Sequence, residues 1–242
     1  MKKENRKKFI FINVTSNAII CAVLVIIFAI TFIGGTTSAF STTNENEYKA
    51  YYKGNSNNNN VSLMFNVYQG TEYITPILNI LKENNVKATF FVGGIWVSQN
   101  SEKLEEIYLS GNEIGNHGYL HKDHEKLSLE SNIEEINVTH KLVNSLIDYN
   151  MTLFAPPSGS YKQETLDAAK SLNYKTIMWT KDTIDWRDQN KKLIYTRAIK
   201  KPTNGDLILM HPTKKTVEAL VDIIKFYKDN NFKVVTVTEN IS

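Results

Sequence analysis

The sequence predicts an α/β protein whose parallel strands form a (β/α) barrel. After residue 60, short apolar segments that suit buried strands alternate with segments whose apolar residues recur at helical spacing. This alternation indicates parallel strands that are connected by helices. Polar residues directly follow five of the expected strands. Side chains from so many strand ends meet only where those ends form one rim, which favours a barrel over an open, doubly wound sheet.

Seven segments are expected to be strands, because each is a short apolar run next to turn-forming or polar residues. They are residues 61–65, 86–92, 113–116, 152–155, 174–179, 206–210 and 232–237. Amphipathic helices are expected between them, and Thr75 and Pro76 offer an N-cap and a first position for the first helix. The apolar stripes are Ile74, Ile77, Leu78 and Leu81, then Ile133, Ile136, Val143 and Ile147, and finally Val217, Leu220, Val221, Ile224 and Tyr227.

The positive charge of the chain is concentrated at its beginning. The 242 residues carry a formal net charge of +3. Residues 1–8 hold five basic residues and one acidic residue and contribute +4, which leaves −1 for the remaining 234 residues. A nucleic-acid-binding domain needs its positive charge on the folded part of the chain. This class of function is therefore excluded.

Residues 1–39 have the composition of a signal peptide or a signal anchor. An apolar core at 18–33 follows the basic residues, and small residues that suit cleavage lead up to Ala39. Two alternatives remain open: an anchor that crosses the membrane with residues 18–37, or a signal that is cleaved near Ala39. Because basic flanking residues stay in the cytoplasm, we expect an extracellular C-terminal domain, either attached to the cell membrane or secreted to the cell wall.

Residues 40–60 are polar and rich in asparagine, which predicts a linker with a short strand at 50–52. The barrel is expected to span residues 61–242. Cys21 is the single cysteine and lies in the apolar leader, so no disulfide is expected in the exported domain. We expect this domain to be a monomer.

His117 and His121 form the sharpest local motif, in the segment His117-Gly-Tyr-Leu-His121. Two imidazoles four residues apart on one turn can point at one cation. Imidazole suits zinc and other late first-row metals. The alternative is that both histidines are polar loop residues that bind no metal.

Asp185 and His211 are candidate catalytic residues. A carboxylate beside Trp186 can orient a catalytic histidine or bind a sugar, with the indole as a platform. The alternative is a helix N-cap next to a core tryptophan. His211 follows the apolar strand 206–210, where it can act as a general acid if Asp185 fixes its tautomer. The alternative is a core histidine with satisfied hydrogen bonds.

In this order along the chain, the motifs resemble those of the polysaccharide deacetylase family, metal-dependent carbohydrate esterases that remove N- or O-acetyl groups. The resemblance runs from about residue 51 to the C-terminus and includes the segments 86–92, 112–117 and 204–211. It implies a deformed (β/α) barrel of seven or eight strands. It also implies a divalent metal, with zinc as the first choice, and cell-wall polysaccharide as the partner.

The resemblance further implies roles for individual residues. His117 and His121 match the two metal-binding histidines, Asp185 and Trp186 match the fourth motif, and Leu209 and His211 match the fifth. In the family, the histidine of the fifth motif protonates the leaving amine. Trp186, Leu209 and Tyr119 are expected to contact the sugar.

Four positions depart from the family's pattern. Asn66 stands where the family has the catalytic base, Val67 where it has a metal ligand, Ala155 where it has an arginine, and Ser158 where it has a tyrosine. Asparagine takes no proton at neutral pH, and valine coordinates no metal. A buried arginine without its carboxylate partner is an unpaired charge that destabilises the folded protein. The loss of the base at position 66 and the loss of the arginine at position 155 therefore belong together. The sequence is similar to a sporulation-associated subgroup whose first motif reads Asn-x-x-x-Gly.

Two functions of different classes follow. The first is a hydrolase that removes N-acetyl groups from amino sugars of peptidoglycan or a chitin-like polymer. The metal would lie on His117 and His121, with Glu72, Asp123 or solvent in the vacant position. Retention of both metal-site histidines and of the Asp185–His211 pair favours this hydrolase, and it is the preferred expectation.

The second function is a non-catalytic carbohydrate-binding or regulatory protein of the cell envelope. Its groove would offer Trp186, Tyr119 and Trp96 as sugar platforms. Loss of the base favours this alternative, because removal of a general base lowers a rate by roughly 10²–10⁴-fold.

Overall fold

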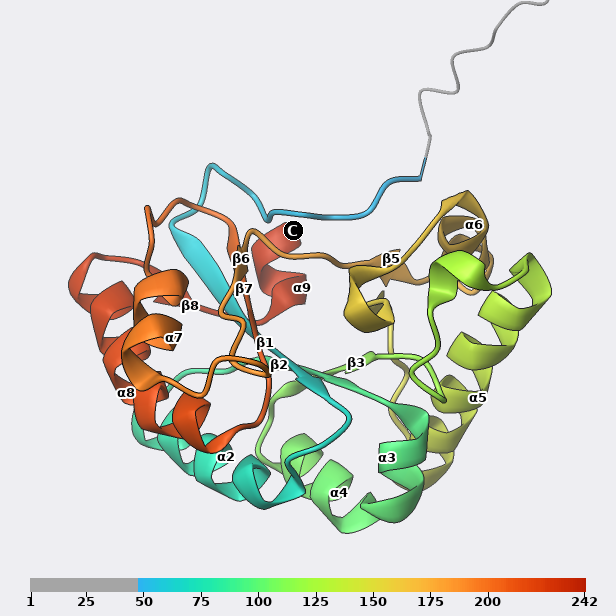
Figure 1. Cartoon of the computed structure of the whole chain (residues 1–242), viewed down its shortest axis with the longest axis horizontal. Coiled ribbons are helices and arrows are strands. Elements are labelled where there is room, and N and C mark those ends of the chain that lie inside the picture. The colour runs from blue at the N-terminus through green and yellow to red at the C-terminus, as the bar shows by residue number, and fades with distance from the viewer. Residues whose placement is uncertain (1–47) are drawn as a thin grey trace, which may run out of the picture. The chain divides into compact units, whose positions relative to one another are not determined.

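Eight parallel strands form one sheet in the computed structural model, which describes residues 48–242 (Figure 1). The strands are β1 (Asn60–Val67), β2 (Thr89–Val92), β3 (Glu113–Asn116), β4 (Leu153–Phe154), β5 (Lys175–Thr176), β6 (Lys181–Asp182), β7 (Asp206–Met210) and β8 (Lys233–Val234). Their order is β5-β4-β3-β2-β1-β7-β6, and β8 pairs with the beginning of β1. The sheet curls, with helices along its outside, and matches the expected deformed (β/α) barrel.

Eight α-helices and three short 3₁₀ helices connect these strands within residues 48–242. The α-helices are α2 (Ile74–Glu83), α3 (Gly94–Gln99), α4 (Ser101–Leu109), α5 (Leu129–Ile147), α6 (Gln163–Ser171), α7 (Lys191–Ala198), α8 (Lys214–Asp229) and α9 (Val237–Ile241). The 3₁₀ helices are η1 (Thr71–Tyr73), η2 (His124–Lys126) and η3 (Pro157–Gly159). The three expected apolar stripes lie on α2, α5 and α8.

The central strand β1 is buried on both faces, and its side chains alternate between two hydrophobic clusters. Leu63, Phe65 and Val67 belong to the large cluster that packs against the helices. Met64 belongs to a smaller cluster inside the curl of the sheet, together with residues of other strands such as Leu207. Because side chains of a strand alternate between its faces, Asn66 lies on the same inner face as Met64.

Two details of the elements differ from expectation. Helix α2 begins at Ile74, after the N-cap residue Tyr73, so Thr75 does not cap it. The Thr75 hydroxyl donates instead to Glu106 on α4, at 2.9 Å. Strand β6 was not expected, because two half-buried polar residues at the end of the sheet give no apolar pattern.

Residues that precede β1 contact the sheet and the C-terminal helix. Tyr51 forms a parallel bridge with Ile177, inside the segment 50–52 that was expected to contain a short strand. The amide of Gly54 donates to the Gly205 carbonyl, and that of Asn55 donates to the Asn240 carbonyl, both at 2.7 Å.

The expected leader lies outside the described residues. This applies to the signal or anchor segment 1–39, its apolar core 18–33, the membrane span 18–37 and the cleavage position at Ala39. Among residues 48–242, the helices are too short or too polar to cross a membrane.

Candidate functional site

A cavity of about 790 Å³ lies at the carboxyl ends of the strands. Most of the residues that the sequence singled out line it: Asn66, His117, His121, Ser158, Trp186, Leu209 and His211. The pairing of the strands explains why they meet. Phe65 on β1 pairs with Met210 on β7, and Val67 pairs with Val92 on β2, which in turn pairs with Asn116 on β3. The polar residues therefore follow neighbouring strand ends.

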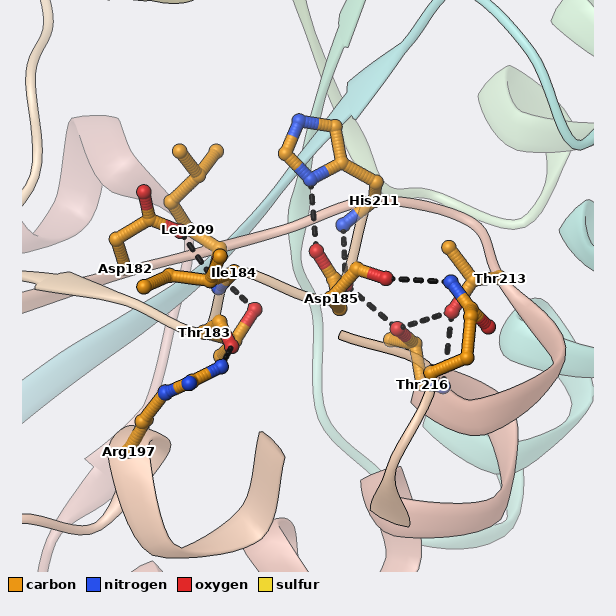
Figure 2. Close-up of polar contacts among 10 residues, drawn as sticks. Asp182, Thr183, Ile184, Asp185, Arg197, Leu209, His211, Thr213 and Thr216 are labelled. Atoms are coloured by element: carbon orange, nitrogen blue, oxygen red, sulfur yellow. Dashed lines mark hydrogen bonds and ion pairs between the residues drawn. The ribbon is translucent and has the colours of Figure 1, made fainter. Parts of the chain in front are cut away.

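Asp185 holds His211 through two hydrogen bonds (Figure 2). The His211 Nδ1 lies 2.8 Å from Asp185 Oδ1, and the His211 amide donates to Oδ2 at 2.7 Å. The Thr216 hydroxyl on α8 donates to the same Oδ2 at 2.5 Å. The side chain of Asp185 is fully buried, whereas 26% of the His211 side chain is exposed toward the cavity. The imidazole is thus fixed at one nitrogen and open at the other.

The segment between β6 and α7 turns Asp185 inward and Trp186 outward. Ile184 has a left-handed backbone (φ 52°), and its amide donates to Asp182 Oδ1 at 2.7 Å. Arg197 on α7 holds the turn by donating to the Thr183 carbonyl at 3.0 Å (Figure 2). Trp186 is 58% exposed, and α7 is capped by Asn190. Asp185 is therefore not a helix cap, and Trp186 is not a core residue.

His117 and His121 lie close together in the loop after β3. Their ring centroids are 5.2 Å apart. His117 is buried, and its Nδ1 donates to the Ala155 carbonyl at 2.7 Å. Burial, together with the neighbouring His121 and His211, lowers the pKa of His117 to about 3, and burial also lowers the pKa of His121. Both rings are neutral at ordinary pH.

A buried carboxylate on α5 shapes this loop. Glu135 Oε2 accepts the amides of Tyr119 and Leu120, both at 2.8 Å, and Oε1 pairs with Lys122 at 3.0 Å. Only 4% of the Glu135 side chain is exposed. Sequence reasoning missed this residue, because one of two adjacent glutamates on a helix gives no sign that it is buried.

The residues present do not complete a metal centre. Catalytic zinc usually has three protein ligands, and the described part of the chain contains no group of three His, Cys, Asp or Glu side chains that could hold a metal ion. Val67 packs in the helix-side hydrophobic cluster. Glu72 and Asp123, the two carboxylates expected to fill the vacant metal-ligand position, do not join His117 and His121. Glu72 lines the cavity but belongs to no metal-binding group in the described chain. Asp123 bonds to Lys126 and Ser160. No chemical step is therefore assigned to a metal.

The altered motif positions have different surroundings. Asn66 is 5% exposed, and its side-chain oxygen is buried without a hydrogen-bond partner in the described chain. Ala155 is buried in the inner cluster with Met64. Ser158 is exposed at the cavity and has a left-handed backbone (φ 56°).

The expected sugar contacts divide into two groups. Leu209 and Trp186 line the cavity. Tyr119 lies outside its lining, with the ring against Gly94. Trp96 is 3% exposed and donates to Thr71 from Nε1, so it offers no platform. Sequence reasoning missed three aromatic residues of the lining, Tyr68, Tyr73 and Trp179, although Tyr68 and Tyr73 follow a strand as the expected site residues do.

Known proteins are similar to this chain over most of its described residues. The family described as polysaccharide deacetylase matches residues 53–177. An uncharacterized protein, YlxY of Bacillus subtilis, is 41% identical over 78% of this chain, which covers 59% of that protein's length. A peptidoglycan-N-acetylglucosamine deacetylase of Bacillus cereus is 31% identical over 78% of this chain and 71% of its own length.

The solved structures include proteins of the same family. The wild-type form of a CE4 family pseudoenzyme from Bacillus anthracis is 37% identical, with a TM-score of 0.79 over 81% of this chain and 69% of that chain. A mutant of that pseudoenzyme with restored enzymatic activity is 35% identical, with the same TM-score over 81% of this chain and 72% of its own. The family match over half of the chain, the identity to a named deacetylase and the shared fold lead to one conclusion: this chain belongs to the polysaccharide deacetylase family.

Proposed function

We propose that this protein is a non-catalytic, peptidoglycan-binding member of its family. The observation that carries the proposal is that the first motif has uncharged residues, Asn66 and Val67, where the family has a base and a metal ligand. Asn66 lines the cavity where the family has its base, and His117 and His121 lack a third protein ligand among the described residues. Hydrolysis of an acetamide needs a group that generates the nucleophile, and Asn66 cannot act as this base because its amide takes no proton at neutral pH. Similarity to a pseudoenzyme supports the same view.

Peptidoglycan is the proposed ligand because relatives are named as peptidoglycan deacetylases and because the cavity suits a sugar. Its lining combines aromatic rings with polar groups, and Trp186 exposes a large part of its indole at the edge. Aromatic faces of this kind stack on sugar rings while polar groups fix their orientation.

We further propose that the domain acts outside the cell. The basic residues before the apolar leader support an orientation with the C-terminal domain outside. The protein is then either anchored through residues 18–37 or released by cleavage near Ala39. The spacing from Asn66 to Gly70 is that of the sporulation-associated subgroup, which supports a role in sporulation.

A slow deacetylase is the second candidate, and the geometry of His211 favours it. In this reaction water attacks the acetyl carbonyl and gives up a proton to Nε2 of His211, the amide C–N bond breaks, and His211 donates that proton to the leaving nitrogen. The products are acetate and a free amine. Asp185 would hold the imidazole and stabilise its charged form, as the 2.8 Å contact allows.

Two measurements on the purified full chain separate these candidates: its metal content, and acetate release from peptidoglycan and acetylated oligosaccharides. We expect no acetate above background and less than one equivalent of metal. The combined variant Asn66→Asp/Val67→Asp/Ala155→Arg is expected to release acetate, and His211→Ala in that variant is expected to abolish the release. Acetate release by the unchanged chain that His211→Ala removes would establish the second candidate.

Peptidoglycan binding is tested separately by co-sedimentation with purified sacculi. We expect the unchanged chain to sediment and Trp186→Ala to sediment at least several-fold less. Tyr108→Ala is the matched control, because Tyr108 is a partly exposed aromatic residue on α4. Absence of sedimentation, or equal loss in both variants, would contradict glycan binding in the cavity.

A further inference from the structure

A second hollow lies beside the cavity of the candidate site, at the helices α7 and α8, which pack side by side (Figure 1). It is an open groove of about 560 Å³, and its lining includes Gln189, Lys191, Lys192, Tyr195, Lys215 and Asp222. Gln189 lines both the groove and the cavity. Its side-chain amide donates to the Asp185 carbonyl at 2.6 Å, which fixes this shared residue. The groove therefore adjoins the cavity.

Basic residues are concentrated around this groove. Residues 187–201 hold six basic residues and one acidic residue, whereas the chain after its first eight residues sums to −1. Three lysines line the groove, and Lys214, the neighbour of Lys215 in sequence, lines the cavity. Against these four ammonium groups, the described chain sets two paired carboxylates, those of Glu218 and Asp222. A surface with this balance attracts an anionic ligand.

The lysines of the groove are accessible to a ligand. Lys192 is exposed and has no ion-pair partner among residues 48–242. Lys191 pairs with Asp222 at 2.8 Å, and Lys215 pairs with Glu218 at 2.7 Å, but the four side chains are 35–52% exposed. Because water screens exposed ion pairs, they contribute little to folding. Both lysines can therefore exchange their partner for a carboxylate of a ligand.

We propose that this groove binds the carboxylates of the short peptides that are attached to a peptidoglycan strand. The inference rests on the proposed glycan-binding function and identifies the form of glycan that the protein recognises. A glycan in the cavity places its substituents at the edge of the cavity, where the groove begins at Gln189. In peptidoglycan these anionic substituents are peptides with free carboxylates. The half-buried ring of Tyr195 offers the small side chains of such a peptide an apolar surface in the same lining.

The first test compares two forms of one peptidoglycan fragment. The fragment is a soluble tetrasaccharide that carries its peptides, either with free carboxyl groups or with the same groups converted to amides. Binding to the full chain is measured by calorimetry at about pH 7, where peptide carboxyl groups are ionised. We expect the carboxylate form to bind roughly tenfold tighter, with a preference that added salt weakens. Equal binding, or tighter binding of the amide form, overturns this inference and leaves glycan binding intact. Binding of neither form overturns the proposed function as well.

The second test removes the charges of the groove with the triple variant Lys191→Gln/Lys192→Gln/Lys215→Gln. The three side chains lie at the surface, so the variant is expected to fold. It should bind the carboxylate form about as weakly as the amide form, with affinity for the amide form unchanged. The corresponding triple arginine variant keeps the charges and should keep the preference. An unchanged preference in the glutamine variant, or its loss in both variants, would overturn the inference.

A matched control and a competitor test the specificity of the groove. The control is Lys82→Gln/Lys141→Gln/Lys170→Gln, which removes the same charge from exposed positions on α2, α5 and α6. An equal loss of affinity in the control would show non-specific attraction and would overturn the inference. The competitor is an oligomer of glycerol phosphate, which offers anions without a glycan. We expect it to displace the carboxylate form only at concentrations at least roughly tenfold above those of the fragment itself. Displacement at equal concentrations would assign the groove to a phosphate polymer and would overturn the inference.

Discussion

Acidification is expected to destabilise this protein through its buried histidines, and His117 makes the best-defined contribution. Burial, with neighbouring rings, lowers its pKa to about 3 in the folded protein, against 6.5 for an ordinary histidine. Because the folded-state pKa is lowered, the unfolded chain takes up the proton first. The stability that the neutral ring provides is therefore complete above pH 6.5 and is lost as the pH falls toward 3.

The size of this effect follows from the two pKa values. Between about pH 7 and about pH 5, the unfolded histidine becomes almost fully protonated while the folded one stays neutral. The free energy of unfolding then falls by about 2 kcal/mol from this residue alone. His121 and His124 also have lowered pKa values, because partial burial of His121 and full burial of His124 disfavour the charged ring. The whole protein should lose more stability than His117 accounts for.

Urea unfolding at the two pH values, with a chelator present, measures the effect. His117→Gln keeps a donor for the Ala155 carbonyl and removes the titration. We expect this variant to lose about 2 kcal/mol less between the two pH values than the unchanged chain. His140→Gln is the control, because His140 is only half-buried and its removal should change the pH dependence less. If His117→Gln and the unchanged chain lose equal stability with equal denaturant slopes, His117 is not the buried, neutral ring described above.

Three further predictions concern the residues that shape the site. Asp185→Asn should lower the free energy of unfolding by about 1–3 kcal/mol, because an amide cannot accept at both ends; an unchanged urea midpoint would contradict this. Glu135→Gln should speed hydrogen exchange of the Tyr119 and Leu120 amides, because both amides donate hydrogen bonds to this carboxylate. Equal exchange rates would show that these hydrogen bonds do not protect the two amides. Ser158→Gly should raise stability by about 0.5–1 kcal/mol, because it relieves a left-handed backbone; a lower melting temperature would argue against that strain.

The sequence predicted the bounds of two strands, came close for β1 and missed β6. The expected segments 113–116 and 206–210 have the same bounds as β3 and β7. Strand β1 runs to Val67, two residues beyond the expected end, because Asn66 continues the pairing with β2 although it interrupts the apolar run. Strand β6 has two polar residues, and only its pairing with β7 defines it.

Site residues that directly follow a strand were predictable, because parallel strands deliver them to one rim. His117 and His211 lie in one cavity for this reason. Glu135 and Thr216 act on the site from helices, and they contact residues that are 16 and 31 positions away in the chain. No local pattern marks such contacts. They depend on how α5 and α8 pack against the sheet.

The changes at the first and third motifs depend on one another, which explains why a single reversion should not restore hydrolysis. A carboxylate at position 66 would lie on the inner face beside the buried Ala155 and Met64, with no cation to offset its burial. An arginine at position 155 alone would enter the same apolar cluster without a partner. An aspartate at position 67 would replace a side chain in the helix-side core. Each change is costly alone, and only the changes at positions 66 and 155 place opposite charges on the same inner face, so the effects of these two should be strongly non-additive. The neutral site is thus an alternative arrangement of this barrel in which no buried charge needs a partner at these positions.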